Sequence, residues 1–152
     1  MTHKMSTEED SFAHDSVVAF LEESNRSYAI DKFKSRELFT YSVPIEDYTH
    51  LIRVEIFIKP YSDKFAFYAL APFEIHSSHY ADVFEIFAMT YDSNTPIRSE
   101  LNPKDGFIRS GMTCFLIEEL VSSERLTQLE HQSVGMIRGM IPWIESLRLE
   151  KE

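Results

Sequence analysis

The sequence predicts an α+β fold: an antiparallel sheet of about five to six strands with helices packed on one face, in the order α-β-β-β-β-α-β-β-α. Three observations predict it. In 51–59, apolar residues at even positions alternate with Arg53, Glu55, Phe57 and Lys59, which is the period of two of a pleated strand. Residues 65–70 form an aromatic and aliphatic run that is typical of a return strand. Stripes with a helical period precede and follow this hairpin.

The first predicted helix runs from Asp10 or Ser11 to about Ser24. Its apolar residues recur at i, i+4, i+7 and i+8, and therefore share one helical face: Ala13, Val17, Phe20 and Leu21. Residues 1–9 are polar and lack periodicity, so we expect a disordered tail there. Residues 10–152 are predicted to form a single domain, because a chain of 152 residues suits one core.

Two strands are expected before the central hairpin. Tyr28 and Ile30 predict a short strand, 31–36 is charged and predicts a turn, and 38–43 alternates up to Pro44, where the strand should stop. The hairpin that follows has its turn at 60–63.

A second helix begins at Ser77 or Ser78, either of which can cap it. One side of this helix is strongly aromatic, and we expect that side to be well buried: Tyr80, Val83, Phe84, Phe87 and Tyr91. Residues 92–96 end the helix and begin a loop.

The remaining chain predicts a second hairpin and a long helix. Strands at 97–102 and 107–117 flank the turn 103–106, where Pro and Gly favour the required backbone angles. The last helix begins at Ser122 or Ser123 and continues towards Leu149, with a buried stripe of Leu126, Leu129, Ile137, Ile141 and Ile144. Pro142 predicts a kink or break near Gly139. Gly135 and Gly139 predict a close approach to a neighbouring element.

Composition bounds the function and the compartment. The 25 acidic and 15 basic residues give a formal charge of -10, which disfavours nucleic acid and anionic membrane surfaces as partners. A single cysteine, Cys114, allows no internal disulfide, and no apolar run suggests a leader or a membrane span. We therefore expect a cytoplasmic location. Four glycines leave little material for phosphate-binding loops, and no cofactor is predicted.

Two sets of residues invite a chemical interpretation. His76, His79 and Asp82 carry zinc-ligand atoms at short spacing, but no general base accompanies them, so capping or surface roles are the alternative. Cys114 would need a neighbouring base to act as a nucleophile, and its phase in the strand favours a buried structural thiol. We predict no catalytic residue and no metal ligand.

The informative feature is the second face of the predicted sheet. If the helices cover Ile52, Val54, Ile56, Cys114 and Leu116, the other face carries the following partner-binding candidates: Phe57, Tyr68, Leu70, Phe107 and Phe115. An apolar patch of this kind is typical of an interface. The alternative is that the N-terminal helix, or the long side chains of Lys59 and Arg109, cover it.

The stretches IFIKPYSDKFAFYALAPF and NPKDGFIRSGMTCFLIEELVSSERL resemble the YbjN-like family, as do the turn at Asp105-Gly106-Phe107 and the helix start marked by Leu126. The resemblance covers residues 10–148. It implies the fold of type III secretion chaperones: a small, acidic, cytoplasmic protein that dimerises and binds a protein segment without chemistry.

These observations define three hypotheses. The first is a non-enzymatic, chaperone-like module, dimeric, which binds a protein segment through the apolar sheet face. The second is an inhibitor, immunity or regulatory protein that binds one folded partner. The third is a small metal-dependent enzyme that uses His76, His79 and Asp82.

Overall fold

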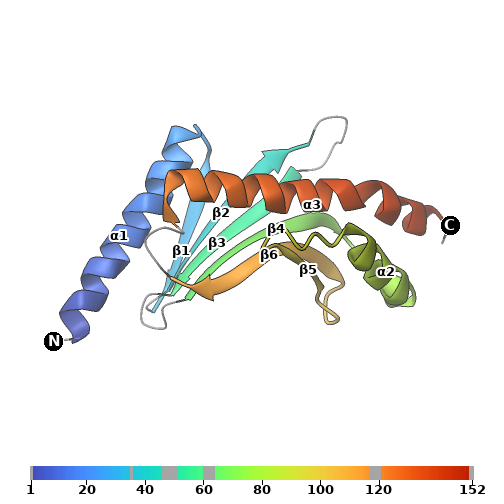
Figure 1. Ribbon diagram of the computed structural model, residues 1–152, viewed down its shortest axis with the longest axis horizontal. Helices are drawn as coiled ribbons and strands as arrows, with labels where there is room; N and C mark the ends of the chain where they lie inside the picture. The colour runs from blue at the N-terminus through green and yellow to red at the C-terminus, as the bar shows by residue number, and fades with distance from the viewer. Residues whose placement is uncertain (1, 35, 46–50, 60–63, 117–120, 151–152) are drawn as a thin grey trace.

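The computed structural model describes residues 2–34, 36–45, 51–59, 64–116 and 121–150. Six strands in this part of the chain form one antiparallel sheet in the order β1-β2-β3-β4-β6-β5, and the long helix α3 lies across one of its faces (Figure 1). The elements are α1 (Thr2–Glu23), β1 (Tyr28–Phe33), β2 (Arg36–Pro44), β3 (Leu51–Lys59), β4 (Lys64–Glu74), the 3-10 helix η2 (Ser77–His79), α2 (Tyr80–Thr90), β5 (Arg98–Leu101), β6 (Phe107–Phe115) and α3 (Ser123–Glu150). The predicted fold class and element order are confirmed.

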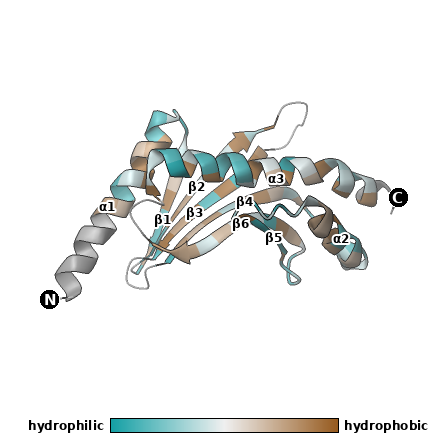
Figure 2. Ribbon diagram, viewed as in Figure 1, coloured by the Kyte–Doolittle hydropathy of each residue, from teal (hydrophilic) through white to brown (hydrophobic). Residues whose placement is uncertain are grey.

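The core lies between the sheet and α3. Ile52, Val54 and Ile56 are fully buried on the covered face, as the alternation of β3 predicted. The predicted stripe of α3 is also confirmed, because each of its five members is buried: Leu126, Leu129, Ile137, Ile141 and Ile144. In Figure 2 the strands below α3 carry brown hydrophobic stretches, whereas α3 alternates between teal and brown along its length. Helices α1 and α2 both pack against α3.

Helix α1 begins at Thr2, well before the predicted start at Asp10 or Ser11. Residues 2–9 contain no Gly or Pro, so no residue among them opposes helical backbone angles. The apolar stripe begins where it was predicted, since Ala13 and Val17 are buried in the core. The disorder proposed for residues 1–9 stays a prediction.

The central hairpin has the predicted strands. Ile56 pairs with Phe67 and Ile58 with Phe65, so the covered face is continuous across the pair. Its predicted turn, 60–63, lies outside the described residues. The turn between β1 and β2 is shorter than predicted, because β1 continues to Phe33 and β2 starts at Arg36.

Gly106 closes the second hairpin as predicted. Its φ of 75° lies in the left-handed region, and its N–H donates to the carbonyl of Asn102 at 2.8 Å. A Cβ at this position would lie 2.4 Å from the carbonyl oxygen of Ile75. The turn therefore needs glycine for its backbone angle and also for its contact with the end of β4.

The predicted aromatic side of helix α2 is buried only in part, which corrects the prediction. Val83 and Ile86 are buried, whereas Phe84 and Tyr91 are 55% and 57% exposed. The helix contacts α3, and Tyr80 and Phe87 pack half-buried against the core. The Arg98 guanidinium lies 4.7 Å from the centre of the Tyr91 ring. Phe84 and Tyr91 are therefore the two aromatic residues of this side that the core leaves exposed.

Helix α3 corrects two further predictions. It continues as a helix through Pro142 to Glu150, so the predicted break does not occur, and the alternative, a kink near Gly139, stays a prediction. A Cβ on Gly135 or Gly139 would have no neighbouring atom within 4 Å, so neither glycine serves a close approach within the described chain. Both lie two residues before members of the buried stripe, Ile137 and Ile141, and about 200° away around the helix. In the described residues, no helix has the length and apolar content needed to cross a membrane.

Candidate protein-binding face

The sheet face opposite α3 is here named the open face. Strand pairing brings all five predicted partner-binding residues to it: Phe57, Tyr68, Leu70, Phe107 and Phe115. Phe57 pairs with Ala66, which pairs with Thr113 on β6, and side chains directly opposite each other share a face. These positions alternate with the core positions of the same strands, so one set of strands builds both surfaces.

The five residues differ in exposure. Phe115 is 77% exposed, Tyr68 only 7%, and Phe57, Leu70 and Phe107 are half-buried. Their burial comes from neighbours on the open face, because the helices pack on the other side of the sheet. Phe115 is the most accessible large apolar side chain in the described chain.

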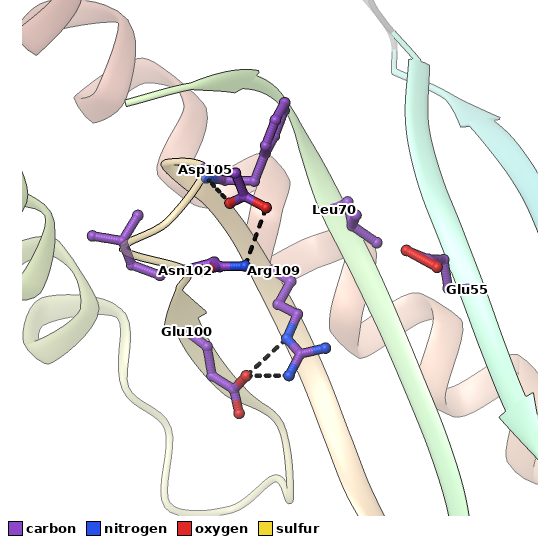
Figure 3. A pocket seen from close by; sticks show the side chains of 8 residues that line it. Glu55, Leu70, Glu100, Asn102, Asp105 and Arg109 are labelled. Carbon is purple, nitrogen blue, oxygen red and sulfur yellow. Dashed lines mark hydrogen bonds and ion pairs between the residues drawn. The ribbon is translucent and has the colours of Figure 1, made fainter. Parts of the chain in front are cut away.

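Two adjoining hollows mark the open face. The first, named the apolar hollow, has a volume of about 380 Å³ and is lined by Leu38, Glu55, Phe57, Lys64, Ala66, Tyr68, Arg109 and Thr113. The second, named the acidic hollow, has a volume of about 390 Å³ and is lined by Glu55, Leu70, Glu100, Leu101, Asn102, Asp105, Phe107 and Arg109 (Figure 3). Glu55 and Arg109 line both hollows and therefore stand at their boundary.

Arg109 explains why Tyr68 is buried on an uncovered face. Its guanidinium lies 3.9 Å from the centre of the Tyr68 ring, a cation–π contact. The same guanidinium binds one Glu100 carboxylate oxygen through Nε at 2.8 Å and Nη2 at 2.7 Å. Arg109 thus covers one ring, as the alternative interpretation expected, whereas α1 packs on α3 and leaves the open face uncovered. A partner would touch Tyr68 only after Arg109 had moved.

Gly111 has no side chain, and this leaves room for the Tyr68 ring. The two residues are paired across β4 and β6, and a Cβ on Gly111 would lie 2.6 Å from Cδ1 of Tyr68. It would also lie 1.9 Å from the carbonyl oxygen of Phe67. The Tyr68 hydroxyl is 2.8 Å from Oγ1 of Thr113, so the ring is fixed at both ends.

The acidic hollow is shaped by the second hairpin turn. Asp105 accepts hydrogen bonds from the Phe107 amide at 3.0 Å and from Nδ2 of Asn102 at 3.1 Å (Figure 3). Three carboxylates and one guanidinium line this hollow, so its lining is net negative. The Glu100 carboxylate is paired with Arg109, and the Asp105 carboxylate accepts hydrogen bonds within the turn. In the part of the chain that the structure describes, the one ion-pair contact of Glu55 is a distant one, 4.0 Å from Arg53.

Several members of the hollows were not predicted from the sequence, among them Leu38, Ala66 and Glu100. Leu38 and Ala66 were placed in strands, but only the pairing of β2, β3 and β4 puts them beside Phe57. Glu100 reaches the site because β6 lies between β4 and β5. Leu38 is directly opposite Phe57 in the β2–β3 pair, so it would have been predicted on the open face if the register of these two strands had been known.

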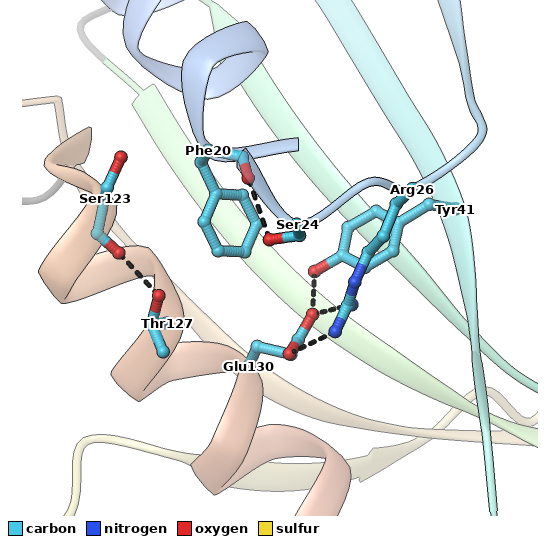
Figure 4. A network of polar contacts seen from close by, with 7 residues as sticks. All are labelled: Phe20, Ser24, Arg26, Tyr41, Ser123, Thr127 and Glu130. Atoms are coloured by element: carbon cyan, nitrogen blue, oxygen red, sulfur yellow. Dashed lines mark hydrogen bonds and ion pairs between the residues drawn. The ribbon is translucent and has the colours of Figure 1, made fainter. Parts of the chain in front are cut away.

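A buried polar network fixes the other side of the sheet (Figure 4). The Tyr41 hydroxyl donates to Oε1 of Glu130 at 2.7 Å, and Arg26 forms a two-pronged ion pair with the same carboxylate. Burial, and next the Glu130 charge, hold the pKa of Tyr41 well above its usual range. The network ties α3 to β2 and to the segment after α1, which indicates a structural role.

The metal-site residues do not converge. Nδ1 of His76 accepts from the Ser78 amide at 3.1 Å and so caps η2, while Nδ1 of His79 is 3.5 Å from Asp82. Among the described residues, no group of three His, Cys, Asp or Glu side chains is arranged to hold a metal ion. The zinc hypothesis therefore has no ligand set in the part of the chain that the structure covers.

Cys114 lies on the covered face, paired with Phe65 and packed against the core. Burial raises the pKa of its thiol, and the nearby Arg125 charge opposes this only in part. A protonated thiol is a poor nucleophile. The interpretation as a structural thiol agrees with this placement.

Comparison with known proteins gave no match to a family model, a curated protein or a solved structure. The fold and the open face are therefore the observations from which a function can be argued.

Proposed function

We propose that this protein is a non-enzymatic, chaperone-like module of the cytoplasm, dimeric, which binds a segment of another protein through its open face. One observation carries the proposal. Phe115, exposed on the sheet, and the apolar hollow beside it form an apolar surface that the protein's own helices leave uncovered. The resemblance to the YbjN-like family implies the same kind of function.

The energetics favour a partner. Fully burying a Phe side chain is worth about 1.5–3 kcal/mol, so covering Phe115 and the exposed parts of Phe57 and Leu38 would supply several kcal/mol of binding energy. An exposed aromatic ring surrounded by half-buried apolar residues is a common composition for the centre of an interface.

The shape of the face favours a narrow partner. Each hollow has the volume of one or two large side chains and is open to solvent. Such hollows suit side chains that project from an extended or helical segment, which is a recurring mode of peptide recognition. A flat, folded partner would bridge the hollows and leave them unfilled.

The chemistry of the linings also favours binding. Two polar side chains of the linings are already used within the protein, because Arg109 binds Glu100 and the Thr113 hydroxyl lies beside that of Tyr68. Among the described residues that line the two hollows there is no histidine and no cysteine. The surface is therefore suited to recognition by apolar contact and charge.

The proposal is tested by affinity capture from lysate of the native organism at low ionic strength, with mass spectrometry of the retained proteins. The bait variants are Phe115→Ser and the double variant Phe57→Ser/Phe115→Ser. Phe84→Ser is the matched control, because Phe84 is also exposed but lies on α2. We expect the control to retain one dominant partner and the double variant to lose it.

Denaturant unfolding of each bait makes the result interpretable. A double variant that folds and still retains the partner would contradict the proposal. If the double variant fails to fold, the single Phe115→Ser variant decides, because that side chain is 77% exposed and contributes little to the core.

Sedimentation equilibrium tests the dimer. A dimer that persists in Phe57→Ser/Phe115→Ser uses another surface and leaves the open face free, as the proposal requires. A dimer that dissociates only in this variant would make the open face a self-interface, and the segment-binding proposal would be wrong.

A further inference from the structure

The open face carries an unusual row of positive charges at one end. Lys59 pairs directly with Lys64, and Lys64 pairs with Phe115. Arg36 precedes Glu37, the partner of Ile58, so strand alternation places Arg36 on the same face beside Lys59. Like charges directly opposite each other destabilise a sheet. Within the described residues, neither lysine forms an ion pair that would relieve this repulsion.

The other end of the open face is acidic. Glu55, Glu100 and Asp105 line the hollow there together with Arg109, and Arg53 lies beside the hollow, opposite Leu70. Along β4, Lys64 at the basic end and Leu70 at the acidic hollow are six residues apart, roughly 20 Å at about 3.3 Å per residue. The apolar hollow lies between the two charged ends.

The boundary residues indicate which carboxylate is available to a ligand. Arg109 already neutralises Glu100, and Asp105 accepts two hydrogen bonds within its turn. Glu55 lines both hollows and is 26% exposed, and its one ion-pair contact among the described residues is with Arg53 at 4.0 Å. A cation in the acidic hollow would therefore pair best with Glu55.

We propose that the open face selects a bipolar segment of a partner protein, an inference that rests on the proposed function. The segment lies extended along β4. Its acidic residues face Arg36, Lys59 and Lys64, an apolar side chain fills the apolar hollow, and a lysine or arginine enters the acidic hollow beside Glu55. The acidic residues of the segment relieve the repulsion within the cationic row, which no ion pair among the described residues relieves.

A second copy of the chain satisfies the charges but not the shape. Two open faces related by a two-fold axis that lies in the interface and runs perpendicular to the strands would place the basic end of each on the acidic end of the other. The four hollows, each of about 380–390 Å³, would then face each other and remain unfilled. Close packing disfavours voids of this size, so a segment that fills the hollows fits the surface better.

The test uses four fluorescein-labelled synthetic peptides with one shared apolar centre of Leu and Phe. Their ends carry Glu at one end and Lys at the other, Glu at both, Lys at both, or Gln at both. Fluorescence anisotropy at low ionic strength measures their affinity for the full-length protein. We expect the bipolar peptide to bind about tenfold more tightly than the other three, since each exposed ion pair changes affinity only a few-fold.

Charge reversal in the protein provides the matched control. Lys64→Glu should weaken the bipolar peptide several-fold and strengthen the peptide with Lys at both ends. Arg138→Glu changes the net charge equally, but it lies on the exposed side of α3 and should leave both affinities unchanged. Glu55→Gln should weaken the bipolar peptide while sparing the Gln-ended one.

The outcomes separate the two proposals. Equal binding of all four peptides, with loss of binding in Phe57→Ser/Phe115→Ser, would overturn the bipolar inference and leave the proposed function standing. Equal effects of Lys64→Glu and Arg138→Glu would also overturn it, since only net charge would then matter. If no peptide binds, both proposals are wrong.

Discussion

The two faces of this sheet are built from the same strands but differ in how much of their apolar content folding uses. On the covered face, Ile52, Val54 and Phe67 are fully buried beneath α3. On the open face, β3 presents Arg53 and Glu55, as a solvent-facing surface should. Strand β4 instead presents Ala66, Tyr68 and Leu70 in addition to its core residues. The apolar residues on the open face do not contribute to the core beneath α3, and for this reason they suggest a binding surface.

The largest expected effect separates the faces by stability. Phe67→Ala removes a fully buried ring from the central strand and should cost about 3–5 kcal/mol. Phe115→Ser, on the open face, should cost about 0.5 kcal/mol or less. Urea unfolding of both variants measures the difference. Comparable losses would mean that Phe115 belongs to the folding core and that the distinction between the faces is wrong.

Gly111 is the exception that sharpens the comparison, because it lies on the open face yet should be intolerant of change. Its Cβ would meet the Phe67 carbonyl oxygen and the Tyr68 ring. We expect Gly111→Ala to cost about 2 kcal/mol or more, which is the scale of overpacking. Thr113→Ser, in the same strand and on the same face, is the control, because it shortens a side chain instead of adding one. Equal stability of Gly111→Ala and Thr113→Ser in thermal unfolding would show that β6 can shift to admit the methyl group.

The buried position of Tyr41 on the covered face should also make the stability of the protein fall at alkaline pH. The unfolded chain ionises Tyr41 near its ordinary pKa of 10.0, whereas burial and Glu130 keep the folded phenol protonated. The unfolded state then binds fewer protons, so the stabilisation is complete below about pH 10 and falls as the pH rises above it. Tyr41→Phe should lose less stability than the wild type between pH 8 and pH 10.5 in urea unfolding. Parallel losses would indicate that Tyr41 is accessible to hydroxide in the folded state.

The smallest effect compares the two sides of α3. Gly139 faces open space in the described chain, so Gly139→Ala should stabilise the protein by about 0.5–1 kcal/mol through helix propensity. Ile141→Ala, on the buried stripe of the same helix, should have the opposite sign. A destabilising Gly139→Ala would reveal a contact on the outer side of α3, such as a partner subunit.

Sequence periodicity predicted the elements and the covered face but not the docking of helices. The stripe of α3 follows from Leu126 to Ile144, and the same stripe implies that Gly135 points away from the sheet, a consequence that the sequence analysis overlooked. In α2, aromatic and aliphatic residues occupy adjoining faces. Which of them is buried depends on how α2 meets α3, and that contact has no local signal.

The open face was also predictable only in part, because periodicity shows which side chains share a face of one strand but not how the strands pair. The alternation of single strands placed Phe57, Phe107 and Phe115 on one side. The hollows depend on strand order, because β6 inserts between β4 and β5 and brings Arg109 between Tyr68 and Glu100. Such long-range pairing is not encoded in any one stretch of sequence. The sequence therefore suggested that Arg109 covers part of the open face, but not that it covers the Tyr68 ring.

The composition of α3 has a consequence for the order of folding. Two glycines and Pro142 oppose an isolated helix by roughly 5 kcal/mol in total, at about 1 kcal/mol for each glycine and 3 for the proline. The first four strands are neighbours in sequence, and their pairing closes only short loops. The sheet should therefore assemble first, with α3 consolidating on it late. Native-state hydrogen exchange should then find the amide protons of residues 135–141 exchanging more readily than those of β3 and β4.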